Sequence, residues 1–425
     1  MRSIVRQFLP LVIFLVGCSI AVHFVQYGQT EGESSRAAEA LLHRGYIGDP
    51  YLLPTGPSAH VSPLQAIYMA GVYAPFGVDT PMSNIILSLV TASIFASGVA
   101  ITLQLVSDLA LTRCGHWVAV GLLLMTSFLV FYEVTICRVW EQPISAVILL
   151  AGWLALVRYK SGAGKWSLYG MAVLAGLGFL LTAAILPSLL LGLGMMLWTG
   201  RHRPGLLTRA IMAGLIVLAM ALPWGVRNEA ALGKFILTRS NFGLELALGN
   251  QPGALGPSSL GWTAPIHPSL SAAAAKQVQD VGEVAYMASM TRLALGWIEA
   301  DPERFAQLTA IRAELSFFPS AAMVGWFPVL GVAVVVLLLT IFGALKLAAC
   351  AGSLALRCQP GPVLVFGVLP LVPYWLTHLY LRYVLLTYFT SVVLITLVID
   401  RAVYQYLPRG IMGLGQRGTG HKNST

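Results

Sequence analysis

The stretch TEGESSRAAEALLHRGYIGDPYLLPTGPSAHVSPLQAIYMAGVYAPFG, residues 30–77, is the first polar segment after a long apolar N-terminal run. In a protein with only 10% charged residues, it gathers a cluster of ionisable side chains: Glu31, Glu33, Glu39, Arg36, Arg44, His43 and His60. Charges are costly to keep beside hydrocarbon, so such a cluster next to a membrane span is a candidate functional site. The alternative interpretation is a solvated loop between two spans.

Outside this stretch the chain is dominated by apolar runs. Of its 425 residues, 57% are hydrophobic, which is more than the core of a soluble protein absorbs. The runs are continuous and do not alternate, which argues against a membrane barrel. The sequence predicts an all-α, multi-pass transmembrane bundle of about ten spans. The runs are 8–27, 84–106, 116–132, 142–158, 167–181, 183–199, 209–225, 326–349, 362–379 and 383–400.

The basic residues predict the orientation of these spans. If the N-terminus is cytoplasmic, the short inner loops hold many Lys and Arg but only two acids, Asp108 and Asp400. This distribution explains the net charge of +9 without a nucleic-acid partner. We expect a protein of the inner (plasma) membrane, with both termini cytoplasmic for an even number of spans. The long polar segments 28–83 and 226–325 then lie on the extracytoplasmic (periplasmic) side.

Capping signals predict helices in both outer segments. Residues 33–44 form a helix that Gly45 ends, and Ser62-Pro63 begins an apolar helix that is too short to cross a bilayer. In the second segment, a helix over 269–300 breaks near Gly282, and Asp301-Pro302 begins another to about Phe318. We therefore expect four parts: an N-terminal transmembrane module (1–225) that includes a catalytic outer loop (28–83), a large outer loop (226–325), C-terminal transmembrane helices (326–407) and a disordered cytoplasmic tail (408–425).

Three groups of residues are candidates for chemistry. Glu33 and Arg36 share a helix face. On that face, we expect the carboxylate to deprotonate an acceptor and the arginine to bind phosphate. The alternative is an exposed ion pair worth under about 1 kcal/mol. The second group suits sugars and phosphates, or else caps loops: Arg227, Asn228, Arg239, Asn241, Glu245 and Asn250. The third group is a candidate for binding a lipid phosphate; the alternative is that its charged side chain extends toward the lipid headgroups. It consists of His378, Arg382 and Tyr383.

Motifs for cofactors and metals are absent from the sequence. There is no Walker A or HExxH motif, and the five cysteines form no CxxC pair. No cofactor is evident, no metal ligands are predicted, and a divalent metal stays open but without support.

Four stretches, in order, resemble the GT-C class of integral-membrane glycosyltransferases. The likeness is greatest to bacterial members related to protein mannosyltransferases and to the lipid A aminoarabinose transferases. ESSRAAEAL (33–41) is similar to the family's D-E-x-R-Y-A-E block. The other stretches are TGPSAHVSPLQAIYMAGVYAPFG (55–77), PWGVRN to RSNFGLELALGNQPGA (223–254) and PYWLTHLYLRY (373–383).

The resemblance implies transfer of a sugar from a polyprenyl-phosphate donor to a lipid, glycan or protein acceptor on the outer face. It places Glu33 at the family's catalytic Asp, as general base, with Glu31 as a rival, and Arg36 at the phosphate-binding Arg. His60 is nearest to a basic residue that some members have where this chain has Val61. The alternatives are a flippase or transporter of lipid-linked sugars, and a polymerase or ligase of surface polysaccharide.

Overall fold

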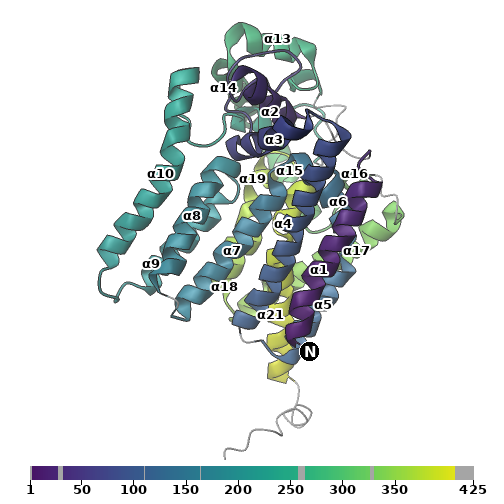
Figure 1. The fold of residues 1–425 in the computed structure, drawn as a ribbon, viewed down its shortest axis with the longest axis vertical. Coiled ribbons are helices and arrows are strands. Elements are labelled where there is room, and N and C mark those ends of the chain that lie inside the picture. The colour runs from purple at the N-terminus through teal and green to yellow at the C-terminus, as the bar shows by residue number, and fades with distance from the viewer. Residues whose placement is uncertain are drawn as a thin grey trace, which may run out of the picture.

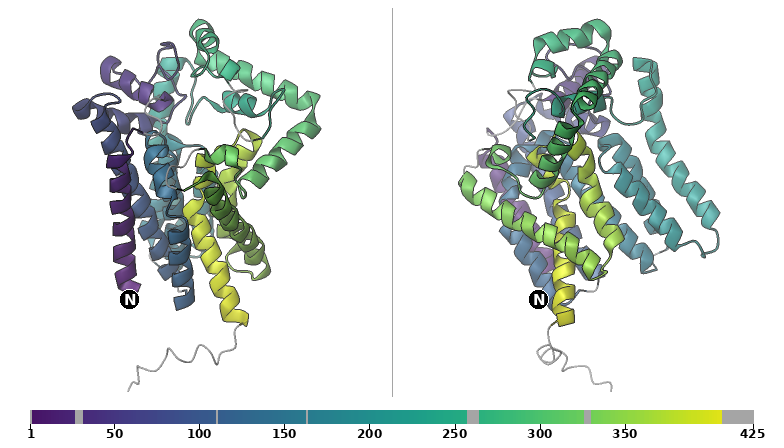
Figure 2. Two further views of the ribbon diagram at one scale, coloured as in Figure 1. Left: turned by 90° about the vertical axis from the view of Figure 1, so that its right-hand side faces the viewer. Right: turned by 180° about the vertical axis from the view of Figure 1, so that it is seen from behind.

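The computed structural model describes residues 2–26, 32–109, 111–162, 164–256, 264–325 and 330–406. Within these ranges the protein is all-α, with no strand and one isolated antiparallel bridge between Gly48 and Pro57. Long helices run side by side, and shorter helices cover the end of the bundle that lies opposite the N-terminus (Figures 1 and 2).

The apolar helices confirm a multi-pass membrane fold. Of the described helices, 6 are long and apolar enough to cross a membrane: α1 (Arg2–His23), α4 (Pro81–Asp108), α7 (Gln142–Lys160), α10 (Leu206–Leu232), α17 (Val332–Ala355) and α21 (Tyr388–Tyr406). A helix pair, α5 (Arg113–Met125) and α6 (Leu129–Thr135), is bent by 55° and forms either one broken span or a re-entrant loop. Three shorter apolar segments are α8 (Lys165–Leu181), α9 (Leu186–Thr199) and Pro360–Leu376. Each predicted run therefore has a helical counterpart, although several are not straight, full-length spans.

Two departures from straight spans have local causes. At Thr182 the chain leaves the helix, and α8 and α9 pack side by side as a hairpin (Figure 1). The segment after Pro360 is assembled from short pieces: α18 (Pro360–Val363), the π-helix η3 (Leu364–Val368), the 3₁₀ turn η4 (Leu369–Leu371) and α19 (Val372–Leu376). Pro370 and Pro373 lack the N–H that a regular α-helix needs, so the hydrogen-bond ladder is interrupted.

The covering helices begin and end as their capping residues predict. They are α2 (Glu33–Arg44), α3 (Pro63–Phe76), α11 (Phe242–Gly249), η2 (Ala264–Ile266), α13 (Ala272–Val281), α14 (Glu283–Ala300), α15 (Pro302–Leu315) and α16 (Ala321–Val324). The Ser62 side chain accepts from the N–H of Gln65, and Asp301 accepts from that of Arg304. Gly45, with φ 75°, ends α2. The predicted break at Gly282 separates α13 from α14, whereas α15 ends at Leu315, before the expected Phe318.

Separate buried clusters hold the spans together and fix the covering helices over them. The spans pack around large buried side chains, including Trp153 stacked on Phe366 with ring centroids 6.0 Å apart. A smaller core under the covering helices joins Tyr51 to Leu244, Val278 and Tyr286. It binds the loop between α2 and α3 to α11, α13 and α14, which brings the two long polar segments together.

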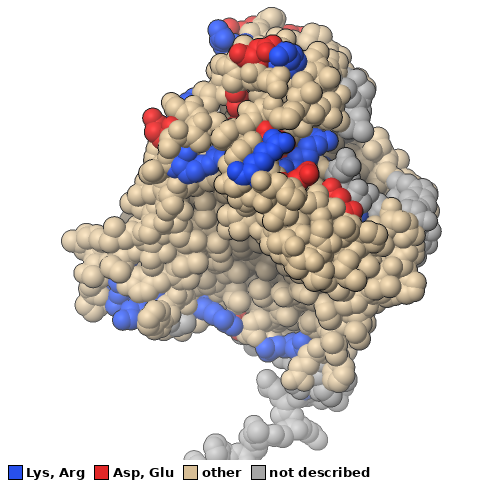
Figure 3. Space-filling model, turned by 45° about the horizontal axis from the view of Figure 1, so that its top comes forward, with Lys and Arg blue, Asp and Glu red and all other residues tan. Residues whose placement is uncertain are grey.

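Charged side chains gather toward the two ends of the molecule (Figure 3). Lys, Arg, Asp and Glu are mixed at the end with the covering helices. A broad uncharged surface follows, and the opposite end shows mostly Lys and Arg. An uncharged belt between two charged ends is the surface that a bilayer-spanning protein presents.

Candidate functional site

A cavity of about 210 Å³ lies where the covering helices meet the bundle. Its walls come from α2, α11, the segment after η2, the residues between the 3₁₀ turn η1 (Cys137–Val139) and the start of α7, and α20 (Leu381–Leu385) with the segment before it. The polar and aromatic side chains in the wall are Glu33, Arg36, Trp140, Glu141, Gln142, Arg239, Glu245, His267, Ser269, His378, Tyr380, Arg382 and Tyr383. Segments far apart in the sequence therefore build one polar chamber.

Glu33 is a buried carboxylate of this wall, and it faces two imidazoles. It is the first residue of α2, and only 8% of its surface is exposed. Its Oε1 lies 3.1 Å from His60 Nε2 and 3.6 Å from His267 Nε2, and Ser269 Oγ donates to it at 2.7 Å. A carboxylate also suits the positive end of α2.

These contacts set the protonation of the cluster. Burial alone would raise the pKa of Glu33, but His60, His267 and the Ser269 hydroxyl outweigh it and hold the pKa below its ordinary value. Burial would lower the pKa of His60, yet the Glu33 charge raises it. The pKa of His267 is lowered, mainly by burial. The favoured state is therefore an ionised Glu33, a protonated His60 and a neutral His267.

Three arginines give the cavity a positive wall. Arg36 Nη1 donates to the Pro50 carbonyl at 3.2 Å. Arg239 is bound to Glu141 at 2.6 Å and to the His60 carbonyl at 2.7 Å. Arg382 lies over three aromatic rings, Trp140 at 4.2 Å, Tyr380 at 4.3 Å and Tyr383 at 4.9 Å from its guanidinium carbon to the centroids. Aromatic faces orient a guanidinium without neutralising it, so Arg382 keeps its charge for a ligand.

Glu245 and His378 form the wall contributed by α11 and the last helices. His378 Nδ1 lies 3.1 Å from Glu245 Oε2, although without hydrogen-bond geometry. Asn241 donates to the other Glu245 oxygen at 2.7 Å. The Gly249 Cα lies so close to the Thr377 carbonyl that an added Cβ would be 1.6 Å from its oxygen. Only glycine lets α11 approach the backbone before His378 this closely.

The structure sorts the residues that the sequence singles out. It brings Glu33, Arg36, Glu245, His378, Arg382 and Tyr383 into one cavity wall. His60 binds Glu33 from behind this wall, and Asn241 binds Glu245. Glu31 lies outside the described residues.

Three of the predicted residues bind backbone and do not line this cavity. Arg227 donates to the carbonyls of Ser58 at 2.8 Å and Ile47 at 2.5 Å. Asn228 is fully buried and donates to Ile236 O at 2.7 Å, and Asn250 donates to Leu376 O at 2.8 Å. These side chains hold the loops in place, which is the loop-capping alternative for this group.

Sequence reasoning missed His267 and Ser269. His267 lies in a stretch, 250–268, that reads as irregular because it is rich in Pro, Gly and Ser, and Ser269 begins the predicted helix over 269–300. The available signal was the histidine itself, one of only 8 in the chain. Glu141 also went unnoticed, since it is an isolated acid at the start of an apolar run.

The residues described offer no metal site. No group of three or more His, Cys, Asp or Glu among them could hold a metal ion. Although Glu33, His60 and His267 are neighbours, both imidazoles face the same carboxylate oxygen, an arrangement for hydrogen bonds and ion pairing.

Comparisons with known proteins give one structural match. No protein-family model and no curated protein matches the chain. Among solved structures, the crystal structure of ArnT from Cupriavidus metallidurans bound to undecaprenyl phosphate matches with a TM-score of 0.40 and 12% identity, covering 94% of this chain and 77% of that chain. The all-α, multi-pass fold is assigned from the helices themselves.

Proposed function

We propose that this protein is a GT-C-type glycosyltransferase that moves a sugar from a polyprenyl-phosphate donor to an acceptor outside the cytoplasm. The observation that carries the proposal is the placement of the ionised Glu33 in the same cavity as Arg36, Arg239 and Arg382. Transfer from a phosphate-linked sugar needs a group that takes the acceptor's proton and cations that stabilise the departing phosphate.

In the proposed reaction the acceptor hydroxyl or amine attacks the anomeric carbon of the sugar. The carbon–oxygen bond to phosphate breaks, and the polyprenyl phosphate leaves with the electron pair. The acceptor's proton passes to Glu33. Because the pKa of Glu33 is lowered, this transfer comes late, once attack has made the acceptor's proton acidic.

The leaving phosphate would lie between Arg36 and Arg382. The aromatic rings around Arg382 keep its guanidinium oriented, whereas Arg239 is already bound to Glu141. A guanidinium binds two phosphate oxygens at once, and its effect grows as negative charge develops in the transition state. Phosphate is a competent leaving group, so no acid catalyst is required.

A second cavity supports a separate route for the acceptor. It measures about 340 Å³, is lined by polar side chains from α2 and the loop after it, and shares Arg36 with the first cavity. Its wall includes Glu39, His43, Arg44 and Asp49. Such a mixture of donors and acceptors suits a hydroxylated or amino acceptor better than an acyl chain.

The decisive experiment compares donors. Purified protein in detergent is supplied with an acceptor extract and with labelled sugars, each offered as the polyprenyl-phosphate ester or as the nucleotide sugar. We expect labelled acceptor and free polyprenyl phosphate only from the lipid-linked donor. Turnover with a nucleotide sugar in the absence of any lipid carrier would refute the proposal. Movement of the intact donor across vesicles without sugar transfer would instead identify a flippase.

A further inference from the structure

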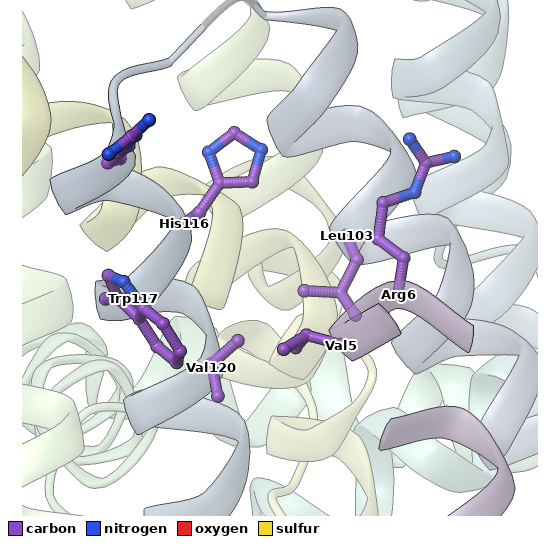
Figure 4. A pocket seen from close by; sticks show the side chains of 7 residues that line it. Val5, Arg6, Leu103, His116, Trp117 and Val120 are labelled. Carbon is purple, nitrogen blue, oxygen red and sulfur yellow. The ribbon is translucent and has the colours of Figure 1, made fainter. Parts of the chain in front are cut away.

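A larger cavity, of about 510 Å³, lies at the opposite end of the bundle, where the N-terminus is. It is formed between α1, α4 and α5, and Figure 4 shows the side chains around it. The lining residues are Val5, Arg6, Leu103, Arg113, His116, Trp117 and Val120. None of them belongs to the site proposed for sugar transfer, so this cavity needs its own explanation.

The lining divides into an apolar part and a cationic part. Val5, Leu103 and Val120 supply aliphatic surface, and Trp117 lies beside them with 51% of its surface exposed. Tryptophan is enriched where a membrane protein meets the boundary between lipid and water. Arg6, from α1, and Arg113, the first residue of α5, supply the cationic part.

The positive charge of this cavity is not cancelled by its neighbours. Arg6 donates to the Gln104 side-chain oxygen, which is uncharged. Asp108, one turn further along α4, is occupied by Arg158 at 2.8 Å and by the Gln104 amide. Within the described ranges no hydrogen bond or ion pair engages the Arg113 guanidinium, and its place in the first turn of α5 adds the positive helix end.

His116 is held in place by two neighbours. Its Nδ1 lies 2.8 Å from the Thr112 carbonyl, so Nδ1–H donates there, and its Nε2 lies 3.2 Å from Ser107 Oγ. Both contacts fix the orientation of the ring, which forms part of the cavity wall. The guanidinium groups available to a ligand are those of Arg6 and Arg113.

We propose that this cavity binds an anionic phospholipid of the surrounding membrane. The phosphate lies between Arg6 and Arg113, and one acyl chain follows the aliphatic surface of Val5, Leu103 and Val120. A free phosphate would leave that aliphatic surface in contact with water, whereas a lipid covers it and satisfies the two guanidinium groups together. The inference is independent of the proposed sugar transfer.

The test measures lipid binding by native mass spectrometry of the full-length protein in detergent. Phosphatidylglycerol and phosphatidylcholine with identical acyl chains are titrated separately, and inorganic phosphate is added as a competitor. We expect the anionic lipid to bind about tenfold tighter than the neutral one, and Arg6→Gln/Arg113→Gln to remove that preference. Inorganic phosphate should not displace the lipid at equal concentration.

Matched variants separate this site from general attraction to the basic end. Arg201→Gln removes an exposed charge outside the cavity, at the turn between α9 and α10, and should leave the preference intact. If the double variant fails to fold, Arg113→Gln alone replaces it, because the exposed Arg113 side chain makes no described contact. Val120→Trp is a second variant, which fills the cavity without changing its charge. Equal binding of both lipids, an equal effect of Arg201→Gln, or displacement by phosphate would overturn the proposal.

Discussion

The imidazoles of His60 and His267 and the Ser269 hydroxyl all contact one carboxylate oxygen of Glu33. The second oxygen is therefore left for the cavity. Glu33→Gln keeps the side-chain volume but cannot take up a proton. We expect it to lower the rate of sugar transfer by about 10²–10⁴-fold while the protein still folds. The measurement is transfer from the lipid-linked donor by purified wild type and variant.

Glu299→Gln is the matched control for that experiment, because Glu299 lies exposed on α14 and lines neither cavity. It should transfer sugar at close to the wild-type rate. Glu31→Gln distinguishes the rival acid: an active Glu33→Gln protein combined with an inactive Glu31→Gln protein would move the role of base to Glu31.

His60 makes the stability of the folded protein depend on pH. The Glu33 charge raises the pKa of His60 above its ordinary 6.5. The folded state therefore holds this proton more tightly than the unfolded chain does. The resulting stabilisation is complete below pH about 6.5 and is lost as the pH rises through the folded pKa. The Tm difference between wild type and His60→Gln should be largest at acidic pH and should shrink as the pH rises above 6.5.

The exposed His43 provides the comparison for the loss of an imidazole. His43→Gln should change the Tm little, because the exposed side chain is not packed in the core. If the difference for His60→Gln instead grows as the pH rises, the ion pair between Glu33 and His60 does not carry the effect.

Among the elements, local signals predict the helices better than they predict the site. Ser62, Asp301 and Gly45 act within a few residues of their own helix ends, so the boundaries they set can be read from the sequence. The contact between Ser269 and Glu33 spans 236 residues. It depends on how the two long polar segments pack, which no local pattern encodes.

The same distinction explains which spans were simple to predict. Apolar length alone identifies α4 and α10, whose composition leaves no alternative. The bend of 55° between α5 and α6 lies in an apolar run that looks like the others. The interrupted segment after Pro360 does carry a signal, because Pro370 and Pro373 break its hydrogen-bond ladder. Composition therefore predicts that a run is helical and apolar but not that it crosses straight.

Glu283, at the start of α14, joins the two long polar segments. Its removal tests how firmly they are held together around the site. Its carboxylate accepts from the Ala59 N–H at 2.9 Å, from Ser240 Oγ at 2.6 Å and from Ser58 Oγ. Glu283→Gln replaces one acceptor oxygen with a donor that faces other donors. We expect it to lower the free energy of unfolding by about 1–3 kcal/mol, measured as a lower Tm.

Glu299→Gln is the control, since Glu299 is exposed on the same helix. It should change the Tm little. The loss in Glu283→Gln should also loosen the loop that carries His60, so sugar transfer should fall together with stability. Unchanged stability in Glu283→Gln would show that the loop is held by Arg227 and the small core around Tyr51 instead.

For the whole molecule, the two charged ends decide which way the protein lies in the membrane. The end with the covering helices mixes acids and bases, whereas the opposite end shows mostly Lys and Arg (Figure 3). Short loops rich in Lys and Arg stay in the cytoplasm. The proposed sugar-transfer cavity would then open outside the cytoplasm, and the proposed phospholipid site would lie at the cytoplasmic boundary.

Reporter fusions test this orientation directly. An alkaline phosphatase reporter, which is active only outside the cytoplasm, should be active after Gly56 and after Lys276 and inactive after His202. A fluorescent protein that matures only in the cytoplasm should give the opposite pattern at the same positions. Lipid-linked sugars displayed on the outer face can reach Glu33 only in this orientation. Cytoplasmic readings after both Gly56 and Lys276 would place the cavity beside the soluble nucleotide sugars, and the choice of a polyprenyl-phosphate donor would lose its topological basis.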